Sequence, residues 1–366
     1  MLSDREMGQN CLQPKRHNRG LVVRQLLTGV CSSRVELARM TGLSKMTVTN
    51  IVSELIEQRF VEECEEKCTE VCGRNPIRLQ ISADAPRVVG LLVLHSRIEA
   101  ALCTLTLDVV KTETVSFLSL SEEQLPVYAC EALDRLLASE SGILAIGVAQ
   151  DVPENLRTFL EERYRLPVVA DTIGSSAALA EKLFGAGRDV EDFVYVGLGD
   201  HIDTGIISGG TTYRSPRGTG PQLGHVSIDR NGPPCSCGGR GCLEIYTGTR
   251  VVLGKLCRAA GRRMRFVQFC RLSGVAEIEE IMTELVSNLS VALIGVVHLI
   301  QPEMIVLGQD GMDWDERHIQ ALEQAVSQGG GGEAIPVRRA GFGRGAPLAG
   351  AAANVVDALC RGELLY

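Results

Sequence analysis

The sequence of 366 residues predicts an α/β protein in which a small helical module precedes a larger body. Three observations lead to this prediction. Two short helices with capping residues are expected near the N-terminus, strand-like and helical segments alternate from residue 88 onward, and a compact histidine and cysteine motif follows residue 224. Hydrophobic residues make up 45% and charged residues 22% of the chain, as in globular proteins. The length exceeds that of one ordinary domain, so we expect at least two packing units.

The N-terminal module has the pattern of a helix-turn-helix. Apolar residues at helical spacing predict a first helix over residues 18–28. Ser33 and Glu36 form a capping box that starts a short second helix. Gly42 can take positive φ in the turn that follows, and Ser44 is placed to cap a third helix that ends near residue 58. Two short helices joined by a tight turn are typical of DNA-binding modules.

The third helix presents polar side chains that can hydrogen-bond to base edges or phosphates. They are Ser44, Lys45, Thr47, Thr49 and Asn50. Residues 60–61 and 77–81 then predict two short strands around a loop that contains Arg74 and Asn75, which completes a winged helix. We therefore expect operator DNA as a partner, with Arg74 reaching a minor groove. A plain helical hairpin with a solvated polar face is the alternative.

The charge is distributed unevenly along the chain. The formal net charge is −8, yet residues 1–59 hold nine Lys or Arg against five Asp or Glu. The remaining residues hold 28 basic and 40 acidic side chains. A basic module on an acidic body would turn one face toward a polyanion. On charge alone, a chance distribution explains this difference equally well.

Three cysteines lie in the expected wing, at Cys64, Cys68 and Cys72. A metal-binding or redox role is one interpretation. However, a fourth ligand is missing, and neighbouring glutamates disfavour thiolates. We interpret these cysteines as incidental.

The body alternates between predicted strands and helices, which indicates two α/β lobes with a cleft. Strands are predicted at residues 88–94, 98–107, 143–148, 168–170, 193–196, 205–207 and 304–307. Helices are predicted at residues 124–138, 154–163, 175–183 and 278–300, with a closing helix from about residue 346.

The densest motif contains His225, Cys235, Cys237 and Cys242. One imidazole and three thiols at this spacing, with glycines and prolines between them, predict a closed tetrahedral structural zinc site. Free cysteines beside a Cys-x-Cys are the alternative. The N-terminus lacks an apolar leader, and the other cysteines lie singly in apolar patterns, so we expect a cytoplasmic protein without a membrane span.

The zinc motif together with the N-terminal module resembles the ROK family of repressors, uncharacterised reading frames and sugar kinases. The resemblance implies a winged helix at residues 1–82 and an actin-like, ribonuclease-H-like two-lobed body at residues 83–366. Lobe one would comprise residues 83–190 with the C-terminal helix at 346–362, and lobe two residues 191–345 with the zinc loop at 225–244. It further implies a homodimeric or homotetrameric transcriptional regulator, with repression of sugar-catabolic genes as the expected role.

The resemblance also allows an alternative function, an ATP-dependent kinase of hexoses or N-acetylated amino sugars. The positions that such a kinase needs are altered. Leu92 replaces the acid of the first phosphate motif, and Thr172-Ile173 replaces the Asn-Asp pair that supplies the catalytic base. Asp171 could serve only after a slip of the sheet. The second phosphate loop carries Asp200 and Asp203, and Gln309 replaces a glycine. We therefore expect no catalytic residue and no enzyme activity.

The sugar site of the family is partly retained. Gln222, His225 and Glu244 match positions that contact the sugar in the family. However, the chain after Ala149 lacks a segment that the family places beside the sugar. A sugar or amino-sugar effector is therefore expected on one interpretation, and on the other His225 is only a metal ligand and Glu244 only caps a helix.

Overall fold

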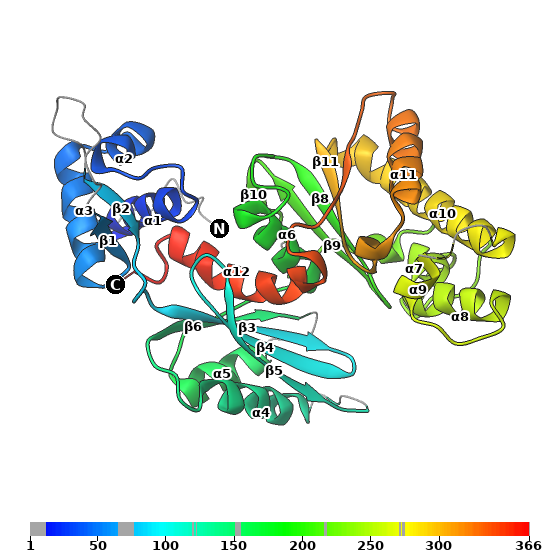
Figure 1. Ribbon diagram of the computed structural model, residues 1–366, viewed down its shortest axis with the longest axis horizontal. Coiled ribbons are helices and arrows are strands. Elements are labelled where there is room, and N and C mark those ends of the chain that lie inside the picture. Colours follow the sequence, from blue (N-terminus) through cyan, green and yellow to red (C-terminus); the bar gives the residue numbers. More distant parts are fainter. Residues whose placement is uncertain are drawn as a thin grey trace, which may run out of the picture. The chain divides into compact units, whose positions relative to one another are not determined.

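The computed structural model describes residues 12–64, 77–118, 121, 123–150, 155–215, 218–270, 272 and 275–365. By their internal contacts these residues form two compact units. Unit 1 comprises residues 1–148, 153–170 and 352–366, and unit 2 comprises residues 149–152 and 171–351. Figure 1 shows the elements of both units. The predicted domain boundaries at residues 82 and 190 stay predictions.

Unit 1 begins with a winged helix, as the sequence predicts. Helices α1 (Leu12–Leu27), α2 (Arg34–Thr41) and α3 (Lys45–Glu57) precede strands β1 (Val61–Cys64) and β2 (Arg78–Ile81). The two strands pair antiparallel, with Val61 opposite Ile81. A small core closes the module because Leu37, Val48 and Val52 are fully buried.

Helix α1 begins at Leu12, six residues before the predicted start at residue 18. The apolar pattern starts late because the first turns of α1 are largely exposed. Pro14 does not prevent the earlier start, since the first turn of a helix does not need its N–H group.

The middle of α1 lies directly against the C-terminal end of the chain (Figure 1). A Cβ atom on Gly20 would lie 2.3 Å from the carbonyl oxygen of Cys360. A Cβ atom on Gly362 would lie 2.1 Å from the carbonyl oxygen of Arg16. The two backbones can approach this closely only because both residues are glycines. The contact fixes the winged helix to the rest of unit 1.

A five-stranded sheet forms the centre of unit 1. Its strands are β3 (Arg87–Leu94), β4 (Arg97–Cys103), β5 (Val109–Ser116), β6 (Ile143–Ala149) and β7 (Val168–Asp171), in the order β5-β4-β3-β6-β7. Helices α4 (Leu125–Leu137) and α5 (Asn155–Tyr164) cover one face, and α12 (Ala346–Cys360) covers the other (Figure 1). On that second face the Asn354 amide donates to the carbonyl of Val148 at 3.2 Å.

The prediction of a single strand over residues 98–107 is wrong, because the chain turns back at Thr104 and forms the hairpin β4–β5. The amide of Thr104 donates to the carbonyl of Asp108, and Leu107 takes a φ of +66°. The Thr106 hydroxyl donates to the Asp108 carboxylate at 2.6 Å. These side-chain bonds fold the turn, although Leu105 and Leu107 continue the apolar pattern of the strand.

Unit 2 is built on a second five-stranded sheet in the order β10-β9-β8-β11-β12. Its strands are β8 (Phe193–Leu198), β9 (Ile202–Ser208), β10 (Thr211–Thr212), β11 (Met304–Gln309) and β12 (Val337–Arg339). Strand β8 pairs antiparallel with β9 and parallel with β11. Helix α6 (Ile173–Phe184) packs on β9, where Gly174 meets the backbone of Thr204. This helix therefore belongs with unit 2.

Five helices complete unit 2: α7 (Leu243–Thr247), α8 (Thr249–Ala259), α9 (Phe266–Cys270), α10 (Ala276–Ile300) and α11 (Glu316–Gly329). They pack around one hydrophobic core that includes Leu256, Phe269 and Leu289, all fully buried. Among the described helices α10 alone is long and apolar enough to cross a membrane. Its buried face packs on α7, α8 and α11, as expected of a core helix.

The backbone contact at Gly20 predicts opposite effects of alanine in two helices. Gly20→Ala should lower the free energy of unfolding by about 1–3 kcal/mol, because the added Cβ must displace backbone atoms. Gly295→Ala in α10 is the matched control, since nothing lies within 4 Å of its Cβ position. It should stabilise by up to about 1 kcal/mol through helix propensity. Denaturant unfolding measures both, and equal effects would contradict the contact.

Candidate functional site

The recognition helix α3 is capped as predicted. The Ser44 hydroxyl accepts a hydrogen bond from the amide of Thr47 at 3.1 Å, and Gly42 takes a φ of +71° in the turn before it. The helix start is therefore fixed by local chemistry. Ser33 caps α2, since its hydroxyl accepts from the amide of Glu36 at 3.3 Å, and the Glu36 carboxylate accepts from the amide of Ser32 at 2.8 Å.

The side chains predicted to contact DNA differ in whether their polar groups already form hydrogen bonds within α3. Ser44 and Thr47 share a hydrogen bond of 2.9 Å between their hydroxyls, and the Thr49 hydroxyl donates to the carbonyl of Lys45. Lys45 and Asn50 are exposed on the same helix and have no such bond to the helix itself among the described contacts. Among the predicted residues that the structure describes, Lys45 and Asn50 therefore keep their side-chain polar groups available to a partner.

Met46 is a candidate that sequence reasoning missed. It is 77% exposed at the start of α3, although methionine is normally buried. An exposed apolar side chain between two polar ones can contact a thymine methyl group in a major groove. Arg74, Asn75, Cys68 and Cys72 lie outside the described residues, so their predicted roles stay predictions.

Helix α3 is braced against α1 by an ion cluster on the Glu54 carboxylate. Lys15 lies 3.3 Å from one carboxylate oxygen, and Arg19 donates to the other from Nε at 2.7 Å. Burial by itself raises the pKa of Glu54, but the hydrogen bonds and charges of Arg19 and Lys15 outweigh it and lower the pKa below its ordinary value. The cluster therefore links α1 to α3.

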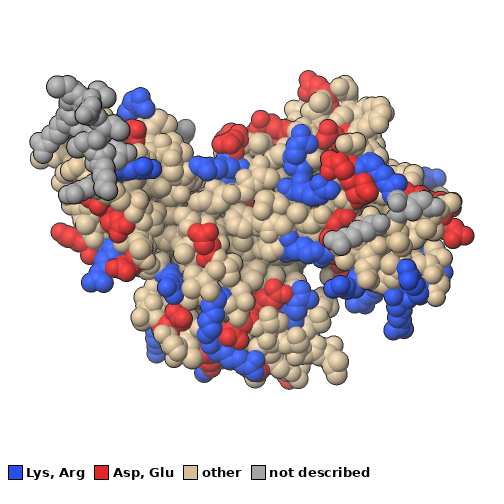
Figure 2. Space-filling model, in the orientation of Figure 1, with Lys and Arg blue, Asp and Glu red and all other residues tan. Residues whose placement is uncertain are grey.

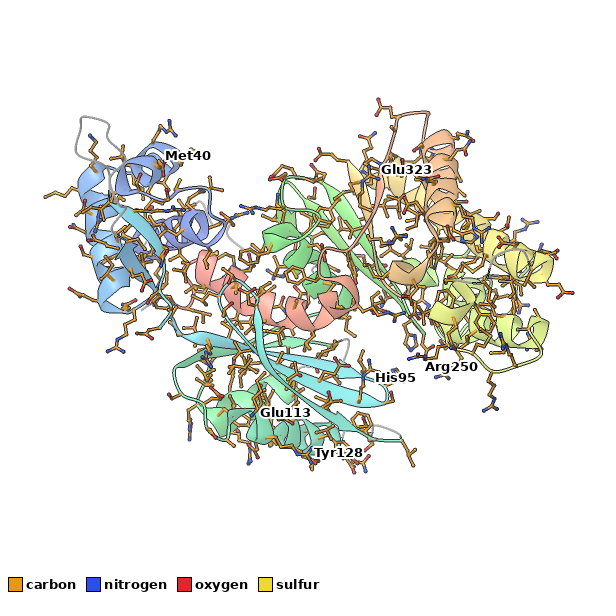
Figure 3. The ribbon with its side chains drawn as sticks, viewed as in Figure 1. Met40, His95, Glu113, Tyr128, Arg250 and Glu323 are labelled. Atoms are coloured by element: carbon orange, nitrogen blue, oxygen red, sulfur yellow. The ribbon has the colours of Figure 1, made fainter. Side chains whose placement is uncertain are left out.

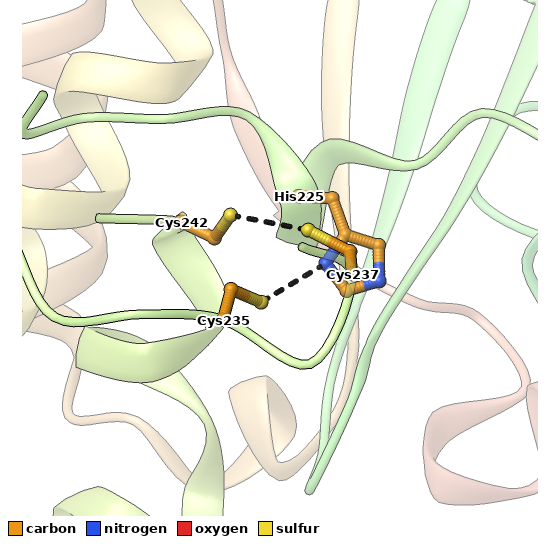
Figure 4. A group of neighbouring side chains, drawn as sticks. All are labelled: His225, Cys235, Cys237 and Cys242. Atoms are coloured by element: carbon orange, nitrogen blue, oxygen red, sulfur yellow. Dashed lines mark hydrogen bonds between the residues drawn. The ribbon is translucent and has the colours of Figure 1, made fainter. Parts of the chain in front are cut away.

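In unit 2 the four predicted zinc ligands lie together (Figure 4). One ligand atom from each of His225, Cys235, Cys237 and Cys242 lies within 4.8 Å of the other three. The sulfurs of Cys237 and Cys242 are 3.6 Å apart, and Cys235 Sγ is 3.7 Å from His225 Nδ1. Zn–S bonds of about 2.3 Å in a tetrahedron require sulfurs almost 4 Å apart. The side chains therefore fit a zinc ion.

The chemistry of the thiols also fits a cation. A hydrogen bond from the backbone of Cys237 lowers the pKa of Cys235 to about 6, so its thiolate forms readily. Burial and the neighbouring thiols raise the pKa of Cys242 to about 12. A divalent cation would reverse that effect, because it stabilises all three thiolates together.

The loop that carries the ligands is shaped by its glycines. Gly238 and Gly241 take φ angles of +90° and +59°. A Cβ atom on Gly241 would lie 1.7 Å from the carbonyl of Asp229, so no other residue fits there. The 3-10 turn Leu223–His225 supplies the histidine, and Cys242 directly precedes α7. A bound metal would thus join the loop to the helical core.

The predicted sugar contacts are partly occupied by the protein itself. Glu244 accepts from the amide of Ile202 at 3.2 Å, and its other oxygen lies 3.2 Å from His201 Nδ1. Gln222 is exposed just before the 3-10 turn. The hydrogen bond to Glu244 raises the pKa of His201. Sequence reasoning missed His201, whose only signal was its place in the altered phosphate loop.

At the positions that a kinase would use for catalysis, the side chains are buried, cap a helix or form an ion pair. Ile173 is buried as the first residue of α6, and the Thr172 hydroxyl caps that helix at Ser175. Asp171 accepts from the amide of Thr172 at 2.8 Å and from Arg214 Nε at 2.8 Å. Asp171 is therefore held in an ion pair at the end of β7.

Side chains also fill the region around the altered phosphate loop. The Gln309 amide donates to the Asp203 carboxylate and lies 2.4 Å from the Cβ position of Gly199. Asp310 accepts from Thr249 at 2.6 Å and from Arg344 at 2.7 Å. The polar groups of these side chains therefore form their hydrogen bonds with one another, within unit 2.

The model of the ROK family matches residues 143–358. The chain belongs to the ROK family. The xylose repressor of Bacillus subtilis is 24% identical, over 94% of this chain and 96% of that protein. A ROK family transcriptional regulator described as a homologue of Escherichia coli Mlc superposes with a TM-score of 0.81, at 21% identity, over 96% of this chain and 98% of that chain. The match shows that this ROK chain has the winged-helix and actin-like fold predicted for it.

A ROK kinase matches a smaller part of the chain. The ROK hexokinase of Thermus thermophilus is 28% identical and superposes with a TM-score of 0.62. It covers 73% of this chain but 97% of its own. A kinase body of this kind is therefore shorter than the present chain, of which about a quarter lies outside the match.

The zinc site predicts a clear effect of ligand removal. Cys242→Ser should reduce the zinc content from about one ion per chain to nearly none and lower the unfolding temperature, because the thiols lose their shared cation. Cys257→Ser in the same unit is the control, since its sulfur lies outside the cluster. Metal analysis of the purified protein measures the content. A purified wild-type chain without zinc, or an unchanged content in Cys242→Ser, would contradict the assignment.

Proposed function

We propose that this chain is a DNA-binding transcriptional regulator of the ROK family and a repressor of sugar-catabolic genes. The supporting observation is the capped recognition helix, with exposed Lys45 and Asn50, ahead of a kinase-like body. The xylose repressor matches 94% of this chain, whereas the hexokinase covers 73% of it. Zinc as a structural ion, a cytoplasmic location and a homodimer or homotetramer complete the proposal.

The proposed regulator is not a kinase. A phosphotransferase needs a free carboxylate near the acceptor hydroxyl and an open backbone around the phosphates. Here the Asp171 carboxylate is paired with Arg214, and Gln309 lies across Gly199. Two added carboxylates, Asp200 and Asp203, disfavour a nucleotide further through repulsion.

The body is proposed to sense a sugar or an amino sugar. Glu244 is buried except for 17% of its side chain, and its carboxylate is fixed by His201 and the amide of Ile202. A fixed acceptor of this kind discriminates between hydroxyl arrangements, because only a well-placed donor reaches it. Gln222, just before the 3-10 turn that leads into the zinc loop, would supply a second polar contact.

Substitution of the recognition helix tests the DNA-binding function. Asn50→Ala should weaken binding to the region upstream of the chain's own gene by about 1–3 kcal/mol and relax sequence preference, because a base contact is lost. Lys45→Ala should weaken binding to all sequences and flatten the salt dependence. Glu57→Gln at the other end of α3 is the control and should not weaken binding. Fluorescence anisotropy measures these affinities. Wild-type protein that binds upstream and random DNA equally well would contradict the function.

A single panel of sugars tests sensing and catalysis together. An effector at a hundred times its Kd should stabilise the protein by about 2.7 kcal/mol in thermal unfolding. Glu244→Gln should abolish this stabilisation. With ATP and Mg²⁺ added, no sugar should be phosphorylated above the background without protein. Turnover that Asp171→Asn abolishes would show instead that this carboxylate is a catalytic base and that the chain is a kinase.

A further inference from the structure

The chain contains a second concentration of positive charge, far from the N-terminal module in sequence. Residues 245–276 hold seven basic side chains and no Asp or Glu. They are Arg250, Lys255, Arg258, Arg262, Arg263, Arg265 and Arg271. Outside this segment and residues 1–59, the chain holds 21 basic and 40 acidic side chains. Two cationic segments therefore stand out from an otherwise strongly acidic protein.

Four of these arginines form an exposed group that we name the arginine patch, Arg258, Arg262, Arg263 and Arg265. Arg250, which points outward at the start of α8, and Lys255 are paired with Asp200 and Glu284 (Figure 3). The four patch arginines have no ion pair with any residue that the structure describes. Figure 2 shows Lys and Arg side chains gathered over the part of unit 2 that holds α8. The patch is thus a cationic surface whose charge is not neutralised by ion pairs with acidic side chains that the structure describes.

The backbone under the arginine patch is fixed on both sides. Helix α8 ends at Ala259, and Gly261 turns the chain with a φ of +64°. The amide of Arg265 donates to the Gln268 side chain at 2.8 Å. Phe266 and Phe269 of α9 then enter the hydrophobic core, where they are 6% and 0% exposed. The arginines therefore extend from an anchored loop, so little backbone entropy is lost when they bind a partner.

The composition of the patch indicates the chemistry of its partner. The guanidinium group is planar and binds phosphate oxygens with two parallel hydrogen bonds. Protein partners are usually anchored by large apolar or aromatic side chains. Between Val251 and Val275, no large hydrophobic residue that the structure describes is exposed. A row of phosphates therefore fits this surface better than an acidic protein does.

We propose that the arginine patch is a second DNA-binding surface, which contacts the phosphate backbone without reading sequence. The proposal rests on the proposed function, since it assumes that DNA is the partner of this chain. The winged helix would then select the site, and the patch would add affinity for duplex DNA of any sequence.

Replacement of all four patch arginines by glutamine tests the proposal. Binding to a long duplex of random sequence is measured against salt concentration. The slope of log K against log salt should become shallower by about 0.9 for each phosphate contact that is lost. The ratio of affinities for upstream and random DNA should stay unchanged, because the patch does not read bases.

The control variant changes the same net charge elsewhere. Arg97, Arg135, Arg157 and Arg163 of unit 1 are exposed arginines that already pair with acidic neighbours. Their joint replacement by glutamine should leave the slope almost unchanged, since paired arginines release few counter-ions. Thermal unfolding of both variants checks that each is folded.

Two results would overturn the proposal. The first is an unchanged slope in the patch variant, and the second is an equal change in the control variant. If the unchanged slope came with a loss of self-association in sedimentation, the patch would be assigned to a second copy of the chain. Failure of the proposed function gives a different result. Wild-type protein would then show no preference for upstream DNA, while the salt slope measured on random DNA would still show whether the patch contacts phosphates.

Discussion

Three sulfur atoms and an imidazole within 4.8 Å of one another place a strong electrostatic constraint on unit 2. Without a cation, thiolates this close repel each other, and buried Cys242 stays protonated. With a divalent cation, the same groups join the 3-10 turn at Leu223–His225 to the start of α7. Helix α8 follows directly, so the cluster fixes a helical pair that carries Glu244 at its start and the arginine patch at its end. A zinc ion bound there would therefore support both the proposed effector site and the proposed second DNA surface.

In the kinase-like body of this protein, the side chains at the altered kinase positions form contacts with one another. In a phosphotransferase, carboxylates and bare backbone must stay available for metal ions and phosphates. Here Asp203 is bonded to Gln309, Asp310 to Thr249 and Arg344, and Asp171 to Arg214. A nucleotide would have to break these bonds before it could form its own. The fold itself does not require such groups to be available, because strand pairing and the hydrophobic core do not depend on them.

The sequence predicts the local parts of this structure well. The caps at Ser33 and Ser44, and the four zinc ligands, depend on residues close together in the chain, so a pattern reveals them. The ion pair of His201 with Glu244 and the contact of Gly20 with Gly362 join residues that are distant in sequence. A glycine within a helical pattern indicates that another segment of the chain packs closely against the helix, but it does not identify that segment. The hairpin at Thr104 was missed for the opposite reason, because buried Leu105 and Leu107 imitate a continuing strand.

The uneven charge of the chain explains how an acidic protein can bind a polyanion. Charges separated by more than about 8 Å are largely screened at physiological ionic strength, so a phosphate responds to the side chains near it and only weakly to the net charge. A cationic segment without internal acids, such as residues 245–276, would therefore attract DNA even though the net charge is −8. The acidic remainder then acts in the opposite direction, because it repels the duplex from every other surface. Charge distribution thus limits which faces of the protein meet DNA, before any base is read.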